Sequence, residues 1–296
     1  MSYKIAVVSG KGGTGKTAFS ISLFNFLRSN LERSKVTIVD CDVEEPNISL
    51  FLKDKTKFYH KLITQDVAVI DEERCKFCKK CSDYCAFNAI VVIPRARYAK
   101  VDSSLCHSCG ACYLACNYDA IGTKQYVAGE VDGYKISSNS YMYEGRLKVG
   151  SPMQTFLIGE LKKELPQDDT ITIYDSPPGT SCSVVETLSG SDFVIIVAEP
   201  TAFGIHDMLL VRELADNLDK PCGIVLNKVE DVERAVEYIP SQHRNDFLGA
   251  LPYSVEFAWN YACGELSYSN EERLKESYFK IFSKLFINEG ADCFKR

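Results

Sequence analysis

Cysteine is the residue type whose spacing in this chain points most directly to chemistry. Eight of the 13 cysteines form two runs with the same pattern, C-x2-C-x2-C-x3-C, and the other five are scattered. In a reducing compartment, thiols at such short repeated spacings are metal ligands before they are disulfide partners. The first run is Cys75, Cys78, Cys81 and Cys85, and the second is Cys106, Cys109, Cys112 and Cys116.

The duplicated runs resemble bacterial-type ferredoxins, in which the fourth cysteine of each run binds the other cluster. The resemblance implies two [4Fe-4S] clusters, one on Cys75, Cys78, Cys81 and Cys116, and one on Cys106, Cys109, Cys112 and Cys85. Zinc is the alternative, but four-cysteine zinc sites usually pair two C-x2-C knuckles and need no third and fourth cysteine in each run. Ala86 and Asn117 replace the proline of the family pattern, which affects loop rigidity and potential.

A glycine-rich loop follows an apolar stretch at residues 3–9 and precedes a helical pattern at residues 18–27. Its sequence, GKGGTGKT, matches the phosphate-binding motif G-x-x-x-x-G-K-[ST] in the strand-loop-helix context that the motif requires. The backbone N–H groups bind phosphates, the second lysine reaches the β and γ phosphates, and the hydroxyl binds Mg²⁺. We therefore expect ATP and Mg²⁺ at Gly10, Gly12, Gly13, Thr14, Gly15, Lys16 and Thr17.

The additional lysine of this loop, Lys11, resembles the deviant phosphate-loop motif of the MinD, ParA and nitrogenase iron protein group. In that group the lysine contacts phosphate across a dimer interface, so the resemblance implies a homodimer in which Lys11 and Lys16 are both catalytic. A positive charge supplied in trans acts as an arginine finger does, completing the site only when two subunits close. A solvated surface lysine is the alternative.

Polar residues follow three further apolar stretches. The resemblance places Asp40 in the Mg²⁺ shell and Asp42 beside the attacking water, with an N-cap or turn role as the alternative for either. It also implies that Asp175 holds Mg²⁺ through water and that the Gly179 N–H senses the γ phosphate. Asn227 is a candidate to read the adenine edge, although asparagine at a strand end is commonly a turn residue.

These residues require a scaffold in which strands alternate with helices. Apolar stretches alternate with helical patterns such as residues 205–218, which predicts an α/β P-loop NTPase with a doubly wound, mostly parallel sheet. An α+β ferredoxin domain is expected as an insertion, which divides the chain into residues 1–63, 64–125 and 126–296. Residues 127–152 are expected to be loops or a small irregular sheet, because they are rich in Gly, Ser, Tyr and Asn. The strand candidates are residues 3–9, 36–39, 170–174, 193–198 and 223–226.

The motifs together resemble the MinD/Mrp-type ATPases, and the main hypothesis is an ATP-hydrolysing homodimer whose nucleotide state gates electron transfer through two clusters. The first alternative is an Mrp-type carrier or assembly factor for clusters, with Cys182 as a possible ligand of a subunit-bridging cluster. The second is a MinD-like positioning ATPase with structural clusters. An amidase related to cobyrinate synthesis would require a glutaminase domain, for which neither the length nor the nucleophile context is present.

Composition limits the possible partners. The net charge of -6 and the lack of a long Lys or Arg run argue against direct nucleic-acid binding. The apolar runs are too short for a secretory signal or a membrane span, which predicts a cytoplasmic protein without a membrane partner. The apolar stretch at residues 274–286 is expected to be a helix docked on the sheet rather than a membrane-targeting tail.

Overall fold

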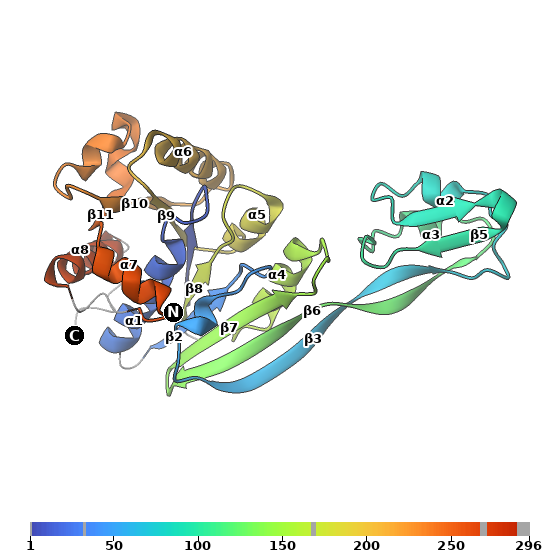
Figure 1. The fold of residues 1–296 in the computed structure, drawn as a ribbon, viewed down its shortest axis with the longest axis horizontal. Coiled ribbons are helices and arrows are strands. Elements are labelled where there is room, and N and C mark those ends of the chain that lie inside the picture. The colour runs from blue at the N-terminus through green and yellow to red at the C-terminus, as the bar shows by residue number, and fades with distance from the viewer. Residues whose placement is uncertain (1, 32–33, 167–169, 267–270, 289–296) are drawn as a thin grey trace.

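The computed structural model describes residues 2–31, 34–166, 170–266 and 271–288. It consists of a body built around a large sheet and of a small unit at the far end of a two-stranded arm (Figure 1). We call residues 71–120 the cysteine unit, because they contain both cysteine runs. The phosphate loop lies in the body, so the two groups of functional residues occupy different parts of the molecule.

The sheet has nine strands in the order β11-β10-β9-β1-β8-β2-β7-β6-β3. Each of the central strands is buried on both faces, as in β9, FVIIVA, which is why these strands read as continuous apolar runs. The predicted mostly parallel α/β sheet is therefore correct. The seven parallel strands are β1 (Tyr3–Val8), β2 (Lys35–Asp40), β7 (Ser140–Leu147), β8 (Thr170–Asp175), β9 (Phe193–Ala198), β10 (Cys222–Val229) and β11 (Phe247–Pro252).

Helices cover both faces of the sheet, with a separate apolar core under each layer. One layer comprises α1 (Lys16–Asn30), α7 (Val255–Ala262) and α8 (Glu272–Asn288), and the other comprises α4 (Gln154–Lys163), α5 (Cys182–Leu188) and α6 (Ala202–Asn217). As expected, α8 docks on the body: Phe282 is fully buried, and its ring centroid lies 5.6 Å from that of Phe19. The side chain of Phe286 lies outside the described residues. No described helix is both long and apolar enough to cross a bilayer.

The arm consists of the antiparallel strands β3 (Thr56–Ile70) and β6 (Ile121–Ser137), which begin at the edge of the sheet and continue beyond it. The expectation of loops or a small irregular sheet at residues 127–152 was wrong for β6 and β7, because residues 129–137 of β6 pair with the whole of β7 in the main sheet. Their glycines serve close packing rather than turns: a Cβ on Gly129 would lie 2.6 Å from the Arg146 carbonyl oxygen. The expected domain boundaries at residues 64 and 125 fall inside β3 and β6 and remain predictions.

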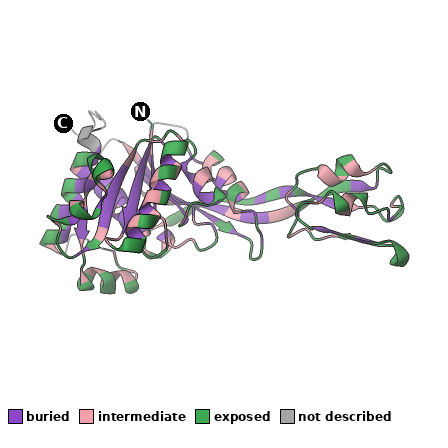
Figure 2. Ribbon diagram, turned by 90° about the horizontal axis from the view of Figure 1, so that it is seen from above, coloured by how far each residue is buried: buried purple, intermediate pink, exposed green. Residues whose placement is uncertain are grey.

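The cysteine unit contains little regular structure. Its elements are α2 (Lys80–Asp83), β4 (Ile90–Ile93), β5 (Tyr98–Val101) and α3 (Ala111–Ala115). Buried residues fill the sheet of the body but are sparse in the cysteine unit, where most residues are exposed (Figure 2). A segment of this size with so few buried apolar side chains normally requires metal or disulfide cross-links to fold.

Candidate nucleotide and cysteine sites

The glycine loop joins β1 to α1 and brings its lysine against an aspartate at the end of β8. Lys16 Nζ lies 3.2 Å from Asp175 Oδ1, and both side chains are buried. Thr17 Oγ1 and Ser20 Oγ each donate a hydrogen bond of 2.7 Å to the same carboxylate. The structure therefore brings together the residues expected to bind the β and γ phosphates and Mg²⁺, and this set of oxygen donors suits a hard cation that keeps several waters.

Asp40 ends β2 directly beside Asp175 in the sheet register. Its carboxylate accepts hydrogen bonds from the backbone N–H groups of Asp42, Asn47 and Ile48 at 3.1, 2.8 and 3.0 Å. Burial and the neighbouring Asp175 raise the pKa of Asp40 to about 7, and burial also raises the pKa of the half-buried Asp42. A divalent cation would favour the ionised carboxylates, so this edge of the sheet fits Mg²⁺.

Gly179 lies in the loop between β8 and α5. Its N–H, which the resemblance assigns to the γ phosphate, donates a 2.9 Å hydrogen bond to the Ser9 carbonyl oxygen. Its φ of 94° is in the left-handed region that favours glycine. Contact with a phosphate would replace the hydrogen bond to Ser9. The Gly179 N–H thus has two alternative acceptors, the Ser9 carbonyl oxygen and a phosphate oxygen.

Lys11 is held within its own subunit by an acidic residue that follows β9. Lys11 Nζ lies 2.7 Å from Glu199 Oε2, and Lys228 Nζ lies 2.7 Å from Glu199 Oε1. Lys228 also donates a 2.7 Å hydrogen bond to the carbonyl oxygen of Gly13 in the phosphate loop. Burial raises the pKa of Glu199, but hydrogen bonds from both lysines outweigh burial and lower it below the ordinary value. Lys11 must leave this carboxylate before it can reach a second subunit.

A cavity of about 270 Å³ adjoins the phosphate loop and has the character of a base-binding pocket. Asn227 borders it, but its Nδ2 donates a 2.7 Å hydrogen bond to the Thr14 carbonyl oxygen, so this side chain also fixes the loop. A Cβ on Gly15 would lie 2.2 Å from that nitrogen, which only glycine avoids. The aromatic residues that line the cavity are Tyr253, Phe257, Tyr261 and Tyr278.

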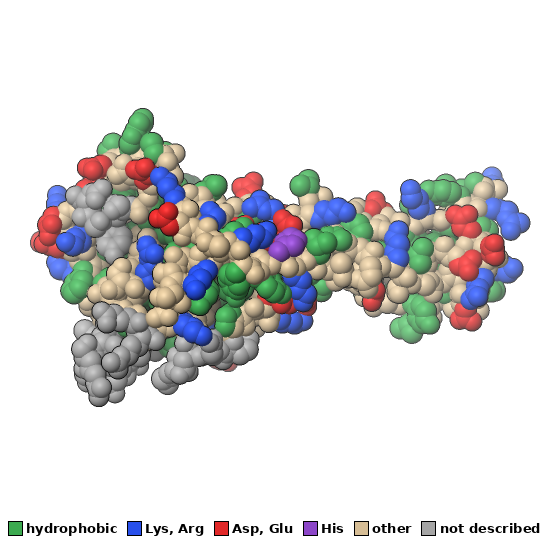
Figure 3. Space-filling view, turned by 90° about the horizontal axis from the view of Figure 1, so that it is seen from below, with side chains coloured by type: hydrophobic (Ala, Val, Ile, Leu, Met, Phe, Trp, Pro, Cys, Tyr) green, Lys and Arg blue, Asp and Glu red, His purple; other side chains and the backbone are tan. Residues whose placement is uncertain are grey.

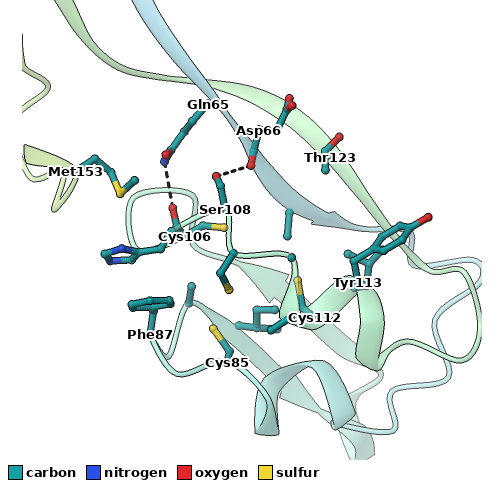
Figure 4. Close-up of a pocket in the computed structure, with 18 of the residues that line it drawn as sticks. Gln65, Asp66, Cys85, Phe87, Cys106, Ser108, Cys112, Tyr113, Thr123 and Met153 are labelled. Carbon is teal, nitrogen blue, oxygen red and sulfur yellow. Dashed lines mark hydrogen bonds between the residues drawn. The ribbon is translucent and has the colours of Figure 1, made fainter. Parts of the chain in front are cut away.

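The eight clustered cysteines line two separate hollows of the cysteine unit. The outer hollow lies within the unit and the adjoining start of β6, and its cysteines are Cys75, Cys78, Cys81 and Cys116. The inner hollow has a volume of about 510 Å³ and is also bordered by Met153, Phe156 and Glu160 of the body. Figure 4 shows Met153 at its edge, and its cysteines are Cys85, Cys106, Cys109 and Cys112. Each hollow thus takes three cysteines from one run and the last cysteine of the other.

The two cysteine runs have the same backbone conformation. Phe77 and Lys79 have φ values of 55° and 68°, and the equivalent Ser108 and Gly110 have 54° and 77°. A short helix begins at the next residue in both runs, α2 in the first and α3 in the second. Positive φ in non-glycine residues costs on the order of 1–3 kcal/mol each, and such conformations cluster where a ligand is bound. The sequence repeat is therefore also a structural repeat built around the two hollows.

The 12 cysteines in the described part of the chain form no disulfides. Burial raises the pKa of Cys81 to about 11 and also raises that of Cys112, so a metal would have to displace protons from these thiols. Among the described residues, no three His, Cys, Asp or Glu side chains gather closely enough to hold one metal ion. Cys182 is exposed at the start of α5.

The body is thus a nucleotide-binding domain of the P-loop class. Residues 5–266 match the family model described as the CobQ/CobB/MinD/ParA nucleotide binding domain, and the chain belongs to this family. It is 32% identical over 225 residues to "Uncharacterized protein MJ0579" of Methanocaldococcus jannaschii, covering 76% of this chain and 79% of the relative. A second protein of that organism, "Uncharacterized protein MJ0578", is 31% identical over 226 residues, covering 76% and 78%.

The fold is also that of solved MinD structures. The septum site-determining protein MinD complexed with Mg-ADP from Pyrococcus horikoshii OT3 superposes with a TM-score of 0.58 at 18% identity, covering 98% of each chain. A chain of the MinC:MinD cell division protein complex of Aquifex aeolicus gives a TM-score of 0.51 at 15% identity, covering 96% of this chain and 95% of that one. At these identities the likeness shows the fold alone.

The comparisons support the nucleotide-binding part of the sequence-based hypotheses but not the iron-sulfur part. They establish a nucleotide-binding domain of the CobQ/CobB/MinD/ParA family, for which ATP and Mg²⁺ are fitting ligands. They give no support to iron-sulfur electron transfer, and they favour the MinD-like alternative over the redox hypothesis. The clusters, the inserted ferredoxin domain and the roles of individual residues remain proposals.

Three residues that make contacts at the nucleotide site were not expected from the sequence. Glu199 follows an apolar strand just as Asp40 does, so the strand-end rule would have found it. Ser20 lies three residues after Thr17 on α1, and helical periodicity would have placed both hydroxyls on one face. No local sequence pattern indicated a role for Lys228, because its ion-pair partner Glu199 lies 29 residues away in the sequence.

Proposed function

We propose that this chain is an ATP-hydrolysing dimer switch whose nucleotide state is passed from the body to a pair of [4Fe-4S] clusters in the cysteine unit. In the closed dimer, Lys16 and Asp175 would act within one subunit, while Lys11 would come from the other. Asp42 would orient the attacking water, and Asp40 would bind Mg²⁺. When bound, the clusters would supply one-electron chemistry.

The observation that carries this proposal is the position of α4 between the inner hollow and α5. α4 and the residue before it border the inner hollow through Met153, Phe156 and Glu160. Its other side packs on α5, the helix that follows the loop containing Gly179. A movement of that loop on phosphate binding would therefore displace α5 and α4 and change the wall of the inner hollow.

Polar contacts join α4 to α5 and to the arm. Lys162 Nζ donates hydrogen bonds to the carbonyl oxygens of Glu186, at 2.7 Å, and Thr187, at 3.3 Å, near the end of α5. The residue after α4, Glu164, accepts a hydrogen bond from the Tyr59 hydroxyl and pairs with Lys61 at 2.5 Å, both on β3 of the arm. α4 is thus attached to the switch side, to the arm and to the hollow at once.

The cysteine hollows fit clusters by their chemistry. A cube distributes four thiolates over four irons, so its ligands surround a hollow rather than converge on one ion, whose zinc–sulfur distances would be about 2.3 Å. The Phe77 N–H donates to Cys75 Sγ at 3.4 Å, a kind of contact that tunes cluster potentials. The loops of both cysteine runs contain residues with positive φ, and the apolar clusters around them are small.

A complementation experiment tests the dimer switch. K11A and K16A should each be inactive alone, whereas an equal mixture should recover about one quarter of wild-type turnover, since half the dimers contain one complete site. K100A, in the cysteine unit, serves as the active control. Failure of the mixture to hydrolyse ATP, although both variants dimerise, would remove the trans role of Lys11.

A second candidate function is a MinD-like positioning ATPase with structural clusters, and the match to MinD over almost the whole chain favours it. Hydrogen exchange separates the two candidates. For a coupled switch, exchange at residues 104–114 should differ between Mg-ADP and a non-hydrolysable Mg-ATP analogue in anaerobically purified protein. Lys162→Met should remove this difference, whereas the neighbouring Lys163→Met should keep it. Identical exchange with both nucleotides would favour structural clusters.

A further inference from the structure

The two hollows differ in charge although they are built on the same repeat. Three lysines border the outer hollow, at positions where the second run has a histidine, a glycine and an alanine. All three lysines are exposed, and no Asp or Glu is among the residues that line this hollow. They are Lys76, Lys79 and Lys80, and the equivalent residues are His107, Gly110 and Ala111.

The inner hollow is closed toward the arm and the body. Gln65 donates a 3.1 Å hydrogen bond to the Cys106 carbonyl oxygen, and Ser108 donates to that of Asp66, so β3 holds the second run (Figure 4). The rings of Phe87 and His107 stack with centroids 3.8 Å apart. Each hollow has one exposed cysteine, Cys78 in the outer and Cys109 in the inner. The lining of the outer hollow includes no residue of the body, so another protein can approach it without contacting the body.

The immediate surroundings of the outer hollow add to its positive charge. The Arg97 guanidinium carbon lies 5.5 Å from the centroid of the Phe77 ring, between the first two cysteines of the run. Figure 3 shows Lys and Arg side chains at the far end of the unit, with carboxylates among them. The acidic turn before the first run does not line the hollow. Its Asp71 pairs with Arg74 at 3.4 Å and accepts the backbone N–H of Glu73, whereas the side chains of Glu72 and Glu73 are exposed.

We infer that the mouth of the outer hollow is the docking site for an acidic electron-carrier protein, one whose carboxylates surround its own redox group. This inference rests on the proposed clusters. The whole chain has a net charge of -6, so its total charge repels such a partner, and the lysines provide a local attraction. Complementary charge of this kind steers association and fixes which part of the partner faces the hollow.

Carbodiimide cross-linking with a bacterial flavodoxin, used as an acidic probe, tests the inference. This reagent joins a lysine to a carboxylate in contact with it, so mass spectrometry should locate the cross-links at Lys76, Lys79 or Lys80. Reversing their charge in K76E/K79E/K80E should lower the association rate with flavodoxin at least about tenfold, and added salt should lower the wild-type rate. Cross-links mainly on the body would overturn the inference.

A matched variant controls for net charge. K124E/K275E/K280E reverses three exposed lysines outside the cysteine unit and changes the total charge equally, so its association rate should stay within about twofold of wild type. Iron and sulfide contents identify which proposal fails. Full iron in the first variant with an undiminished association rate sinks the docking site alone, whereas iron-free wild-type protein after strict oxygen exclusion sinks the proposed function.

Discussion

The body and the cysteine unit hold their binding residues in opposite ways. In the body, two cores support the sheet, and Asp175 is already satisfied by Lys16, Thr17 and Ser20. In the unit, few side chains are buried, the loops have positive φ and the described cysteines form no disulfides. The nucleotide site is thus preorganised by the protein, whereas the strained backbone of the cysteine loops is supported by few buried side chains and by no cross-link within the described chain. This difference predicts that the two regions respond differently to loss of their ligands.

Iron removal should produce the largest effect, and it should affect the cysteine unit but not the body. Treating the anaerobic protein with ferricyanide and a chelator should unfold residues 71–120, because binding energy of a structural metal, about 10–16 kcal/mol for zinc in small domains, is folding energy. Hydrogen exchange should show loss of amide protection there, while ATP affinity of the body should change less than about twofold. A unit that stays protected without iron would contradict the proposed dependence.

Lys16→Ala should have the opposite selectivity and affect the body but not the cysteine unit. Loss of the charge beside Asp175 and the phosphates should reduce kcat by about 100-fold or more, since one positioned donor in a catalytic site is worth about 2.7–4 kcal/mol. Iron content and exchange in residues 71–120 should match wild type. Lys53→Ala, at an exposed ion pair with Glu265, provides the matched control in the body. Loss of iron in the Lys16 variant would show that the two regions are not separable.

The smallest expected effect concerns the preorganised carboxylates. Without Mg²⁺, Asp40 keeps its proton up to about pH 7 in the folded body, against 3.8 in an unfolded chain. The folded state then binds more protons between these values, so the free energy of unfolding should fall as pH rises from about 4 to about 7. The decrease is at most roughly 4 kcal/mol, and less because Asp175 shares the charge.

Thermal unfolding at several pH values measures this effect. The body of wild-type protein without Mg²⁺ should have a Tm several degrees higher at pH 5 than at pH 8. Asp40→Asn should flatten this dependence, because an amide does not titrate in the range. A profile with the same slope in both proteins would assign the pH dependence to other groups.

Part of the fold was accessible from local patterns, and part was not. Continuous apolar runs indicated the buried central strands, because a strand with helices on both faces needs apolar side chains on each. The same rule failed for β6 and β7, whose glycines and polar residues read as irregular structure. Gly129 is required by the carbonyl of Arg146 in a neighbouring strand, a contact that no local pattern contains.

Motif spacing alone was enough to indicate a phosphate loop with two lysines and a duplicated set of cysteines, since both motifs work through backbone geometry over a few residues. Only the tertiary structure placed Lys11 against Glu199, packed α4 on α5 after the Gly179 loop, and set the inner hollow against the body and the outer hollow away from it. These contacts depend on strand order and on the length of the arm. Such long-range packing follows from the whole chain, which is why short patterns carry no record of it.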